Sequence, residues 1–599
     1  MATLHVDMEP NMACQLRRSM VDFPGKEGRK FLPIKKLEEI VTRETTKREL
    51  QSTGVPNGRI NAILDDIFAP PTRRKIFAII VLIERASDIQ EFIRSGLDDS
   101  NLPFSKTSFD SQHASQLQFF RAWKYVETEF FYEHQWVLLA PFFVFPTATI
   151  HAAPHYEFQD RVILPYIQSD ETNPATRVEG GFSDVWKVKI HTAHHNLPSN
   201  PGQSQCFAIK RLRRSDKGQF DSESKALRRF NHPHIIKLLA TYEQNKRYHL
   251  VFPWADGDLR DLWASYPSPH TKLQGSIRWL AGQCTGLAHA LRTIHQPLSG
   301  AGGIRGRHGD LKPDNILWFG KGQGGLGTLV IADFGLTKFH SDASKSCSKA
   351  AAVAFSPSYR PPECDIENGM ATDRFDIWSL GCLFLEFVTW VFYGYDHVVS
   401  TFPSRRYEDD NSKSQEDKFF RVVIEPPGRL TVVVKPAVTQ WVESLRSHPS
   451  CPGYLRDVLD LVRYSMLVMD PKGRLDADGV YRALFAMEQK HFGRFRNEWV
   501  LEEEQPHLEE ASSPPPSAGK RPRGFGRFGD IETDTAPGPE AALPPTAPVP
   551  VPVKRQKQAK NEDIRNYSCP YRKRNPLRFN IRSHQKCALT TFPDISQVK

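Results

Sequence analysis

The eight residues from 308 to 315, His-Gly-Asp-Leu-Lys-Pro-Asp-Asn, hold polar side chains at a spacing that phosphoryl transfer can use. Asp310 can accept the proton of an attacking hydroxyl group, and Lys312 can neutralise the phosphoryl group that moves. Asn315 can offer an amide oxygen to a divalent cation. Eighteen residues further on comes Asp333, preceded by an apolar run and followed by Phe-Gly. This pattern predicts a strand that carries a second cation ligand into a turn.

Other residues could hold the phosphates of a nucleotide. Lys210 ends the strand-like run Phe-Ala-Ile-Lys, and Glu223 follows thirteen residues later on a predicted helix. A strand lysine is more often a solvated residue, but this spacing resembles that of the protein kinases, in which the glutamate pairs with the lysine and keeps its ammonium group aimed at the phosphates. Upstream, the segment Val178-Glu-Gly-Gly-Phe-Ser-Asp-Val185 precedes a strand, and Gly180 is where the backbone could approach phosphates most closely. A glycine pair by itself usually marks only a turn.

Composition excludes several classes of protein. A chain of 599 residues is too long for one core, and its 25% charged and 39% apolar residues are ordinary for a soluble protein. No continuous apolar run reaches the roughly 18 residues of a membrane span. The first residues lack the organisation of a secretory signal, and nine scattered cysteines fit free thiols. We therefore expect a protein of the cytoplasm or nucleus, with no membrane partner.

Periodicity and composition divide the chain into five segments. Residues 1–150 look mainly helical and carry no evident chemistry, so we expect a helical N-terminal domain of unknown role, with a buried helix over 76–83. Residues 160–253 read as strands around one helix, and residues 254–492 read mostly as helices. Residues 502–553 are rich in proline and predict a disordered linker, followed by a tail at 554–599.

The motifs, in this order, resemble those of the eukaryotic protein kinase superfamily over residues 160–492. The resemblance implies an α+β fold with a small strand-rich lobe, a large helical lobe and a cleft between them. Asp310-Leu-Lys312 resembles the serine/threonine type. The segment ending at Glu363 resembles the family's Ala-Pro-Glu, whose glutamate pairs with an arginine placed here at Arg474. Asp376, in Asp-Ile-Trp, resembles the aspartate that braces the catalytic-loop backbone.

The resemblance also implies a chemistry and a set of site residues. The expected activity is transfer of the ATP γ-phosphate to protein serine or threonine, with Mg²⁺ as cofactor. Phe252 would close the back of the adenine pocket, Val185 and Ala208 would sandwich the ring, and Ala255 would supply hinge hydrogen bonds because Pro253 has no N–H. The implied catalytic residues are Asp310 and Lys312, the metal ligands are Asn315 and Asp333, and the nucleotide contacts are Val178, Gly180, Val185, Ala208, Lys210, Glu223, Phe252 and Ala255.

The chain departs from the family pattern at several positions. Gly309 replaces the usual arginine of His-Arg-Asp, which pairs with a phosphorylated loop, so we expect no switching by loop phosphorylation. Val178 and Ser183 stand where the glycine-rich loop has glycines. The His-Gly-Asp and Glu-Gly-Gly-Phe-Ser motifs resemble a group of fungal kinase-like proteins. In these proteins a helical region precedes the kinase domain, and some carry a C-terminal cysteine-containing module.

The tail suggests a second, weaker hypothesis. Residues 554–599 contain 12 Lys/Arg and 3 Asp/Glu, which is +9 of the net charge of +10. The basic clusters at 520–523 and 554–557 predict contact with a nuclear-import receptor or weak contact with nucleic acid. Cys569 and Cys587 resemble part of a zinc-finger-like module, but the four ligands that zinc needs are incomplete even with His584.

Two alternatives to the kinase hypothesis follow from these departures. The first is a pseudokinase adaptor, which binds partners without catalysis; the altered glycine-rich loop favours it, whereas the complete set of polar site residues argues against it. The second is a nucleic-acid-associated protein that acts through its tail.

Overall fold

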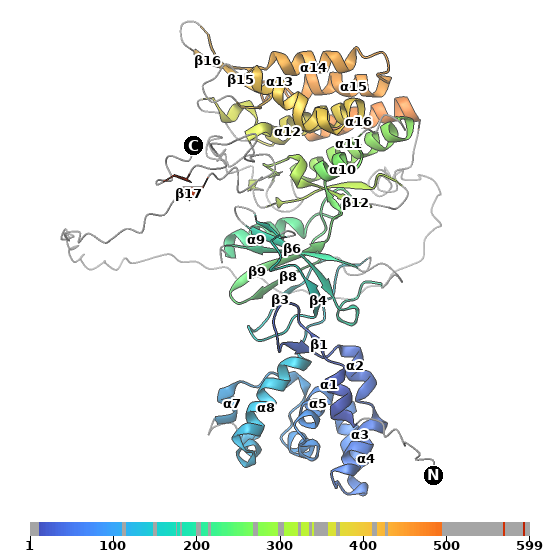
Figure 1. Cartoon of the computed structure of the whole chain (residues 1–599), viewed down its shortest axis with the longest axis vertical. Coiled ribbons are helices and arrows are strands. Elements are labelled where there is room, and N and C mark those ends of the chain that lie inside the picture. Colours follow the sequence, from blue (N-terminus) through green and yellow to red (C-terminus); the bar gives the residue numbers. More distant parts are fainter. Residues whose placement is uncertain are drawn as a thin grey trace, which may run out of the picture. The chain divides into compact units, whose positions relative to one another are not determined.

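Residues 155–253 form a seven-stranded sheet in the computed structural model, with strand order β3-β8-β9-β7-β6-β4 and with β5 paired to β6 (Figure 1). Burial alternates residue by residue along β6, because one face of the strand packs on a core. The sheet includes β3, which lies before the predicted start of the strand-rich lobe at 160. The strands are β3 (His155–Glu157), β4 (Tyr166–Ser169), β5 (Val178–Glu179), β6 (Ser183–Ile190), β7 (Phe207–Leu212), β8 (Ala240–Gln244) and β9 (Arg247–Pro253).

Strand pairing places several predicted site residues on one face of this sheet. Val185 lies opposite Lys210, and Ala208 lies opposite Phe252. Directly opposed residues point to the same face, as do residues two apart on a strand, so all four share a face. Helix α9 (Lys217–Leu227) packs on this face through the core cluster that contains Phe252, whereas the other face belongs to a separate cluster around Trp186.

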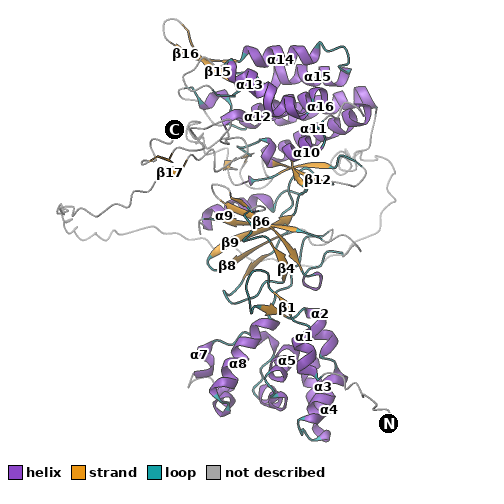
Figure 2. Cartoon of the chain, viewed as in Figure 1, coloured by secondary structure: helices purple, strands orange, loops and turns teal. Residues whose placement is uncertain are grey.

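Helices dominate after residue 258 (Figure 2). α11 runs through the middle of this lobe and packs along α16, since both carry apolar residues at helical spacing. The helices are α10 (Leu259–Ser265), α11 (Leu273–His295), α12 (Arg374–Tyr393), α13 (Phe402–Glu408), α14 (Pro436–Arg446), α15 (Gly453–Leu461) and α16 (Ala477–Phe492), with π-helical turns η12 (His397–Thr401) and η13 (Val462–Met466).

Helix α12 is the core of the helical lobe. Within the part of the chain that the structure describes, it is the one helix long and apolar enough to cross a membrane, but 94% of its apolar window is buried inside the protein. Its two acidic residues inside that window, Asp376 and Glu386, both bind partners within the lobe. These features are those of a buried core helix.

A small sheet near the junction of the lobes positions the catalytic motifs. It consists of β10 (Gly257–Asp258), β12 (Ile316–Phe319) and β13 (Thr328–Ile331), in that order. Ile316 lies opposite Ile331, so Asn315 and Ala332 meet at the same end of the hairpin. The Ala332 N–H donates to the Asn315 carbonyl over 2.9 Å. The chain before β12 and the chain after β13 are thereby held side by side.

The residues before 139 form mainly helices around a core of their own. At its centre, every residue of α5 from Ile76 to Leu82 is buried, which confirms the buried helix predicted there. This part also contacts the turn that follows β6: the Ile34 N–H donates to Nε2 of His194, and the Phe31 ring lies 5.5 Å from the His194 ring. The helices are α1 (Met12–Arg18), α2 (Ile34–Ile40), α3 (Arg43–Ser52), α4 (Asn57–Phe68), α5 (Arg74–Leu82), α6 (Ile89–Arg94), α7 (Lys106–Asp110) and α8 (Tyr125–Gln135).

Met1–Pro506 form one compact unit and His507–Lys599 form a second. The proline-rich segment, both basic clusters, Cys569, His584 and Cys587 lie outside the described residues. Further two-stranded antiparallel sheets are β1 (Val21–Asp22) with β2 (Lys30–Phe31), β11 (Arg305–Arg307) with β14 (Lys338–His340), β15 (Phe420–Glu425) with β16 (Arg429–Val434), and β17 (Tyr567–Ser568) with β18 (Thr591–Phe592). The structure describes residues 11–493, with gaps at 111–114, 148–151, 175–176, 180–182, 199–204, 214–216, 268–272, 297–304, 321–324, 335–337, 341–356, 367–371, 410–415 and 426–428, together with 567–568 and 591–592.

Candidate active site

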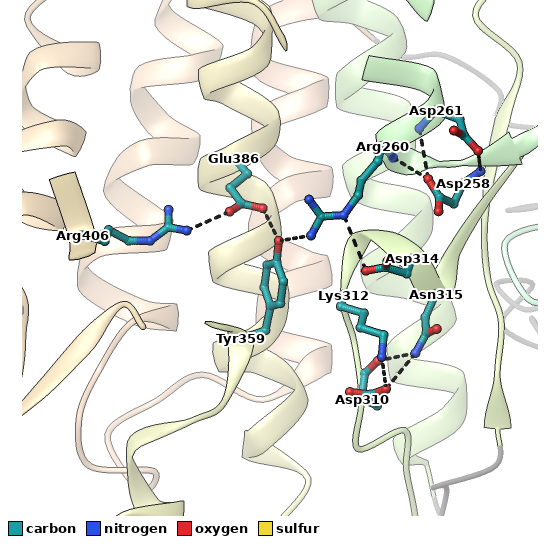
Figure 3. Close-up of polar contacts among 10 residues, drawn as sticks. All are labelled: Asp258, Arg260, Asp261, Asp310, Lys312, Asp314, Asn315, Tyr359, Glu386 and Arg406. Atoms are coloured by element: carbon teal, nitrogen blue, oxygen red, sulfur yellow. Dashed lines mark hydrogen bonds and ion pairs between the residues drawn. The ribbon is translucent and has the colours of Figure 1, made fainter. Parts of the chain in front are cut away.

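Three polar side chains converge in the loop before β12 (Figure 3). Nζ of Lys312 lies 2.6 Å from Oδ2 of Asp310. The Asn315 amide nitrogen donates to the Asp310 carbonyl over 2.7 Å and to its Oδ2 over 3.2 Å. Charge-assisted hydrogen bonds of this kind fix the rotamer of the carboxylate. Asp310 is therefore held by two partners while part of its side chain, 11% exposed, still reaches solvent.

The residues predicted to hold a cation fit that role. The amide nitrogen of Asn315 is used by Asp310, which turns the amide oxygen to the other side. Asp333 follows Ala332, whose N–H is bonded to Asn315, and its side chain is 51% exposed. Among the described residues no group of three or more His, Cys, Asp or Glu side chains could hold a metal. Two oxygen ligands from the protein are enough for a Mg²⁺ ion that takes its other ligands from phosphates and water.

The backbone of Asp333 is left-handed, with φ of 64°. A non-glycine residue in this region stores strain, and such residues gather at functional sites where their surroundings hold them. Here the carboxylate accepts a hydrogen bond from Lys210 over 2.8 Å. The Phe334 ring next to it is buried between the rings of Phe230 and His308, at 5.8 and 5.3 Å. Packing of Phe334 and the Lys210 contact therefore support the strained conformation of Asp333.

The predicted ion pair between Lys210 and Glu223 is present. Nζ of Lys210 lies 2.6 Å from Oε1 of Glu223 and both side chains are buried. Burial acts to lower the pKa of Lys210, but the negative charges of Asp333 and Glu223 outweigh it and raise that pKa. The ammonium group is thus charged at every physiological pH, and it lies between helix α9 and Asp333, one of the two predicted cation ligands.

We expect Glu223→Gln to weaken the use of ATP strongly. The amide cannot balance the Lys210 charge, and a hydrogen bond to a charged group contributes about 1.5–3 kcal/mol, so kcat/KM for ATP should fall about 10- to 100-fold. Steady-state kinetics at varied ATP concentration measure this. Ser222→Ala, an exposed change on the same helix, is the control and should leave the kinetics unchanged. Equal kcat/KM values for Glu223→Gln and native protein would contradict the prediction.

The other predicted nucleotide contacts lie on the face of the sheet that carries Lys210. Ala208 packs partly buried against the core cluster that contains Phe252, and Phe252 is 8% exposed. Val185 is half-buried opposite Lys210, and Val178 pairs with it from β5 with 64% of its surface exposed. These apolar side chains could flank a planar base. Gly180 lies outside the described residues.

In the predicted hinge, which follows β9, one backbone N–H group has no partner among the described residues. The N–H groups of Trp254 and Asp256 donate to the carbonyls of Cys206 and Trp318. The Ala255 N–H, which lies between them, has no partner among the described residues. This arrangement matches the expectation that Ala255, and not Pro253, would donate to the edge of an adenine ring.

A buried carboxylate braces the catalytic loop from behind. Asp376 of α12, 1% exposed, accepts the backbone N–H groups of His308 and Gly309, each over 2.8 Å, and contacts Nε2 of His295 over 2.7 Å. Burial alone would raise the pKa of Asp376, but the His295 hydrogen bond and charge outweigh it, so the pKa is lowered. The predicted bracing role of Asp376 is confirmed.

Gly309 has a positive φ of 84°, which side-chain-bearing residues rarely adopt. A side chain at this position would strain the loop that Asp376 holds. Glycine in place of the family's arginine therefore fits the backbone conformation at position 309.

The predicted pair between Glu363 and Arg474 is also present. Two parallel hydrogen bonds of 2.9 and 3.0 Å join the guanidinium group to the carboxylate, and the two side chains are 0% and 2% exposed. The guanidinium also lies 5.4 Å from the Trp378 ring. This pair joins the segment that ends at Glu363 to the turn before α16.

Sequence reasoning missed a polar chain that links the catalytic loop to the lobe interior (Figure 3). Arg260 of α10 lies 3.6 Å from Asp314 and donates to the Tyr359 hydroxyl over 3.4 Å. Tyr359 donates to Glu386 over 2.7 Å, and Arg406 donates to the other oxygen of Glu386 over 3.3 Å. The one available signal was a glutamate inside the apolar sequence of α12. Its partners are too distant in sequence to be found by pattern.

The fold and the site define a class of protein. Residues 193–485 match the model of the protein kinase domain. The strand-rich sheet, the helical lobe and the residue pairs described above agree with that match. Residues 193–485 therefore correspond to a protein kinase domain.

Similar proteins include named serine/threonine kinases. The serine/threonine-protein kinase RUNKEL of Arabidopsis thaliana is 33% identical over 184 residues, which cover 31% of this chain and 12% of that protein. Cyclin-dependent kinase 2 of Caenorhabditis elegans is 26% identical over 267 residues, or 43% of this chain and 63% of that protein. Cyclin-dependent kinase 4 of Xenopus laevis is 33% identical over 213 residues, or 35% and 55%. The chain spans less than two thirds of the length of each of these proteins.

Proposed function

We propose that this protein is a serine/threonine protein kinase that transfers the γ-phosphate of ATP to hydroxyl groups of protein substrates. The observation that carries the proposal is the network around two lysines. Lys210 bonds to both Glu223 and Asp333, and Lys312 bonds to Asp310. These contacts support the proposal because phosphoryl transfer needs one positive side chain for the inner phosphates and one beside the proton acceptor.

Each residue then has a defined task in the reaction. Asp310 orients the acceptor hydroxyl and takes its proton as the hydroxyl oxygen bonds to the γ-phosphorus. The bond from that phosphorus to the β,γ-bridging oxygen breaks, and ADP leaves with the electron pair. Lys312 offsets the charge on the phosphoryl group in flight, and Lys210 holds the phosphates that stay behind. Mg²⁺, when held by Asn315 and Asp333, would neutralise further phosphate charge.

The experiment that tests the proposal is phosphate transfer by the full chain. The protein is incubated with γ-labelled ATP, Mg²⁺ and a generic protein acceptor, and the labelled amino acids are then identified. Label on serine or threonine that disappears when EDTA removes the metal is the expected result. ATP binding without transfer to any acceptor would instead favour a pseudokinase adaptor.

We expect activity to be independent of phosphate on the segment that contains Ser344, Ser346 and Ser348. Gly309 stands where a phosphate-binding arginine would be, and its positive φ disfavours that arginine. Alanine replacement of Ser344, Ser346 and Ser348, which lie outside the described residues, should therefore change kcat by no more than about twofold, the range of neutral surface changes. The assay compares the triple variant with native protein. Complete loss of activity would show that a loop phosphate is needed.

A further inference from the structure

The chain between the N-terminal helices and the sheet forms a strap, which we define as residues 141–147 and 152–158. The strap first crosses the sheet face opposite α9. Phe143 and Phe145 are fully buried there, in the core cluster of Trp186. The Phe143 N–H donates to the His194 carbonyl, and the Phe145 N–H donates to the side-chain oxygen of Asn196. These hydrogen bonds attach the strap to the segment after β6, and apolar burial attaches it to the face of the sheet.

The strap then adds strand β3 to the edge of the sheet, beside β8 (Figure 1). The pairing is parallel, with His155 opposite Thr241. The Thr241 N–H donates to the Pro154 carbonyl and the Phe158 N–H donates to the Glu243 carbonyl, each over 2.9 Å. β8 would otherwise be an edge strand with unpaired backbone groups. The chain covers this edge with its own segment.

At this edge the strap meets helix α9 from the side. Ala153 is buried in the core cluster that includes Phe220 and Leu227 of the helix. The His155 ring lies 5.4 Å from the Phe220 ring, which stacks on Tyr248 at 4.4 Å. The strap therefore contacts the helix one turn before Glu223.

One buried hydroxyl joins the strap to the end of the same helix. Oγ1 of Thr241, a residue with no exposed surface, accepts a hydrogen bond from Nη2 of Arg228 over 3.0 Å. Arg228 continues the last turn of α9, because its N–H donates to the Ser224 carbonyl. The same Oγ1 lies 2.9 Å from Nδ1 of His155. A single side chain of β8 thus contacts both the strap and the helix.

We propose that Thr241 is a positioning residue for the active site. By contacting both the strap and α9, Thr241 holds the helix where Glu223 meets Lys210. Glu223 lies one helical turn after Phe220, so a shift of the helix against the strap moves the carboxylate directly. The chain itself therefore supports α9, and the contact of Glu223 with Lys210 does not require a phosphate on a loop. The expected effect of Thr241 on catalysis rests on the proposed kinase function.

The test compares Thr241→Val with Thr241→Ser in the full chain. Valine keeps the shape of the side chain and removes the hydroxyl group, whereas serine keeps the hydroxyl. Since each hydrogen bond contributes about 1 kcal/mol, amide hydrogen exchange in residues 217–228 should be about fivefold to tenfold faster in Thr241→Val. Exchange in α11 should stay at the native rate in both variants. Thr241→Ser should behave as native protein throughout.

Kinetics give a second readout that a purely structural role would not produce. In Thr241→Val, kcat/KM for ATP should fall about fivefold to tenfold while KM for the protein acceptor stays unchanged. His155→Ala removes only the His155 contact of Thr241, from an exposed side chain, and should give a smaller change in the same direction. This variant replaces Thr241→Val if that variant does not fold.

Native exchange rates over 217–228 in both Thr241→Val and His155→Ala would overturn the proposal. The exchange measurement does not need catalysis, so it decides the positioning role even if native protein transfers no phosphate. If native protein transfers no phosphate, the proposed function is wrong, but faster exchange in the variants still supports the contact between the strap and α9.

Discussion

Replacing Asp310 with asparagine is expected to lower kcat for phosphate transfer by about 10²- to 10⁴-fold, the contribution of a positioned general base. Asparagine has the same size as aspartate, so the loop held by Asp376 should keep its conformation. Its amide cannot take the hydroxyl proton, and it leaves the charge of Lys312 without its 2.6 Å partner. Affinity for ATP should change little, because most of the residues predicted to contact the nucleotide lie in the other lobe.

Single-turnover kinetics with saturating ATP measure the chemical step directly. Nucleotide titration of the same variant checks that binding is retained. Asp396→Asn, the same chemical change at an exposed position of the helical lobe, is the control and should match native protein. If Asp310→Asn and native protein transfer phosphate at equal rates, Asp310 has no part in the mechanism.

Breaking the buried pair between Glu363 and Arg474 should destabilise the helical lobe more than any exposed change. Arg474→Met leaves a carboxylate that is 2% exposed without its bidentate partner. Removal of one member of a buried pair typically costs about 3–5 kcal/mol, because the remaining charge cannot reach water. We expect the free energy of unfolding to fall by about this amount.

Denaturant unfolding measures the loss, and a double variant separates its causes. Adding Glu363→Leu to Arg474→Met removes the orphaned charge, so the double variant should lose less stability than the sum of the two single changes. Arg482→Met is the matched control, since that arginine is 75% exposed in its pair with Asp478 and should matter by less than about 1 kcal/mol. Equal losses in Arg474→Met and Arg482→Met would show that the buried pair is not important.

Much of the site could be predicted from local spacing. The pair of Lys210 with Glu223 was predicted because the spacing of these two residues resembles that of the kinase family, in which they form an ion pair. The role of Asp376 and the pair of Glu363 with Arg474 came from motif resemblance and are present in the structure. The buried helix α5 followed from seven successive apolar residues, which no exposed helix could carry.

Other features depended on tertiary structure alone. The strap strand β3 is three residues long, too short to show a period, and its partner Thr241 is 86 residues away in the sequence. The chain of contacts from Arg260 through Tyr359 to Glu386 likewise joins segments separated by up to about a hundred residues. Gly309 could be seen as a departure, but only the backbone shows its positive φ.

The sequence by itself therefore determined the chemistry available to this protein: which carboxylates, amides and cations stand at spacings that suit phosphoryl transfer. The tertiary structure decided which of them are held, and by what. Side-chain type and spacing are local properties, whereas strand register, burial and contacts across many residues arise only when the chain packs. The contact of Thr241 with both the strap and the end of helix α9 is a property of the second kind.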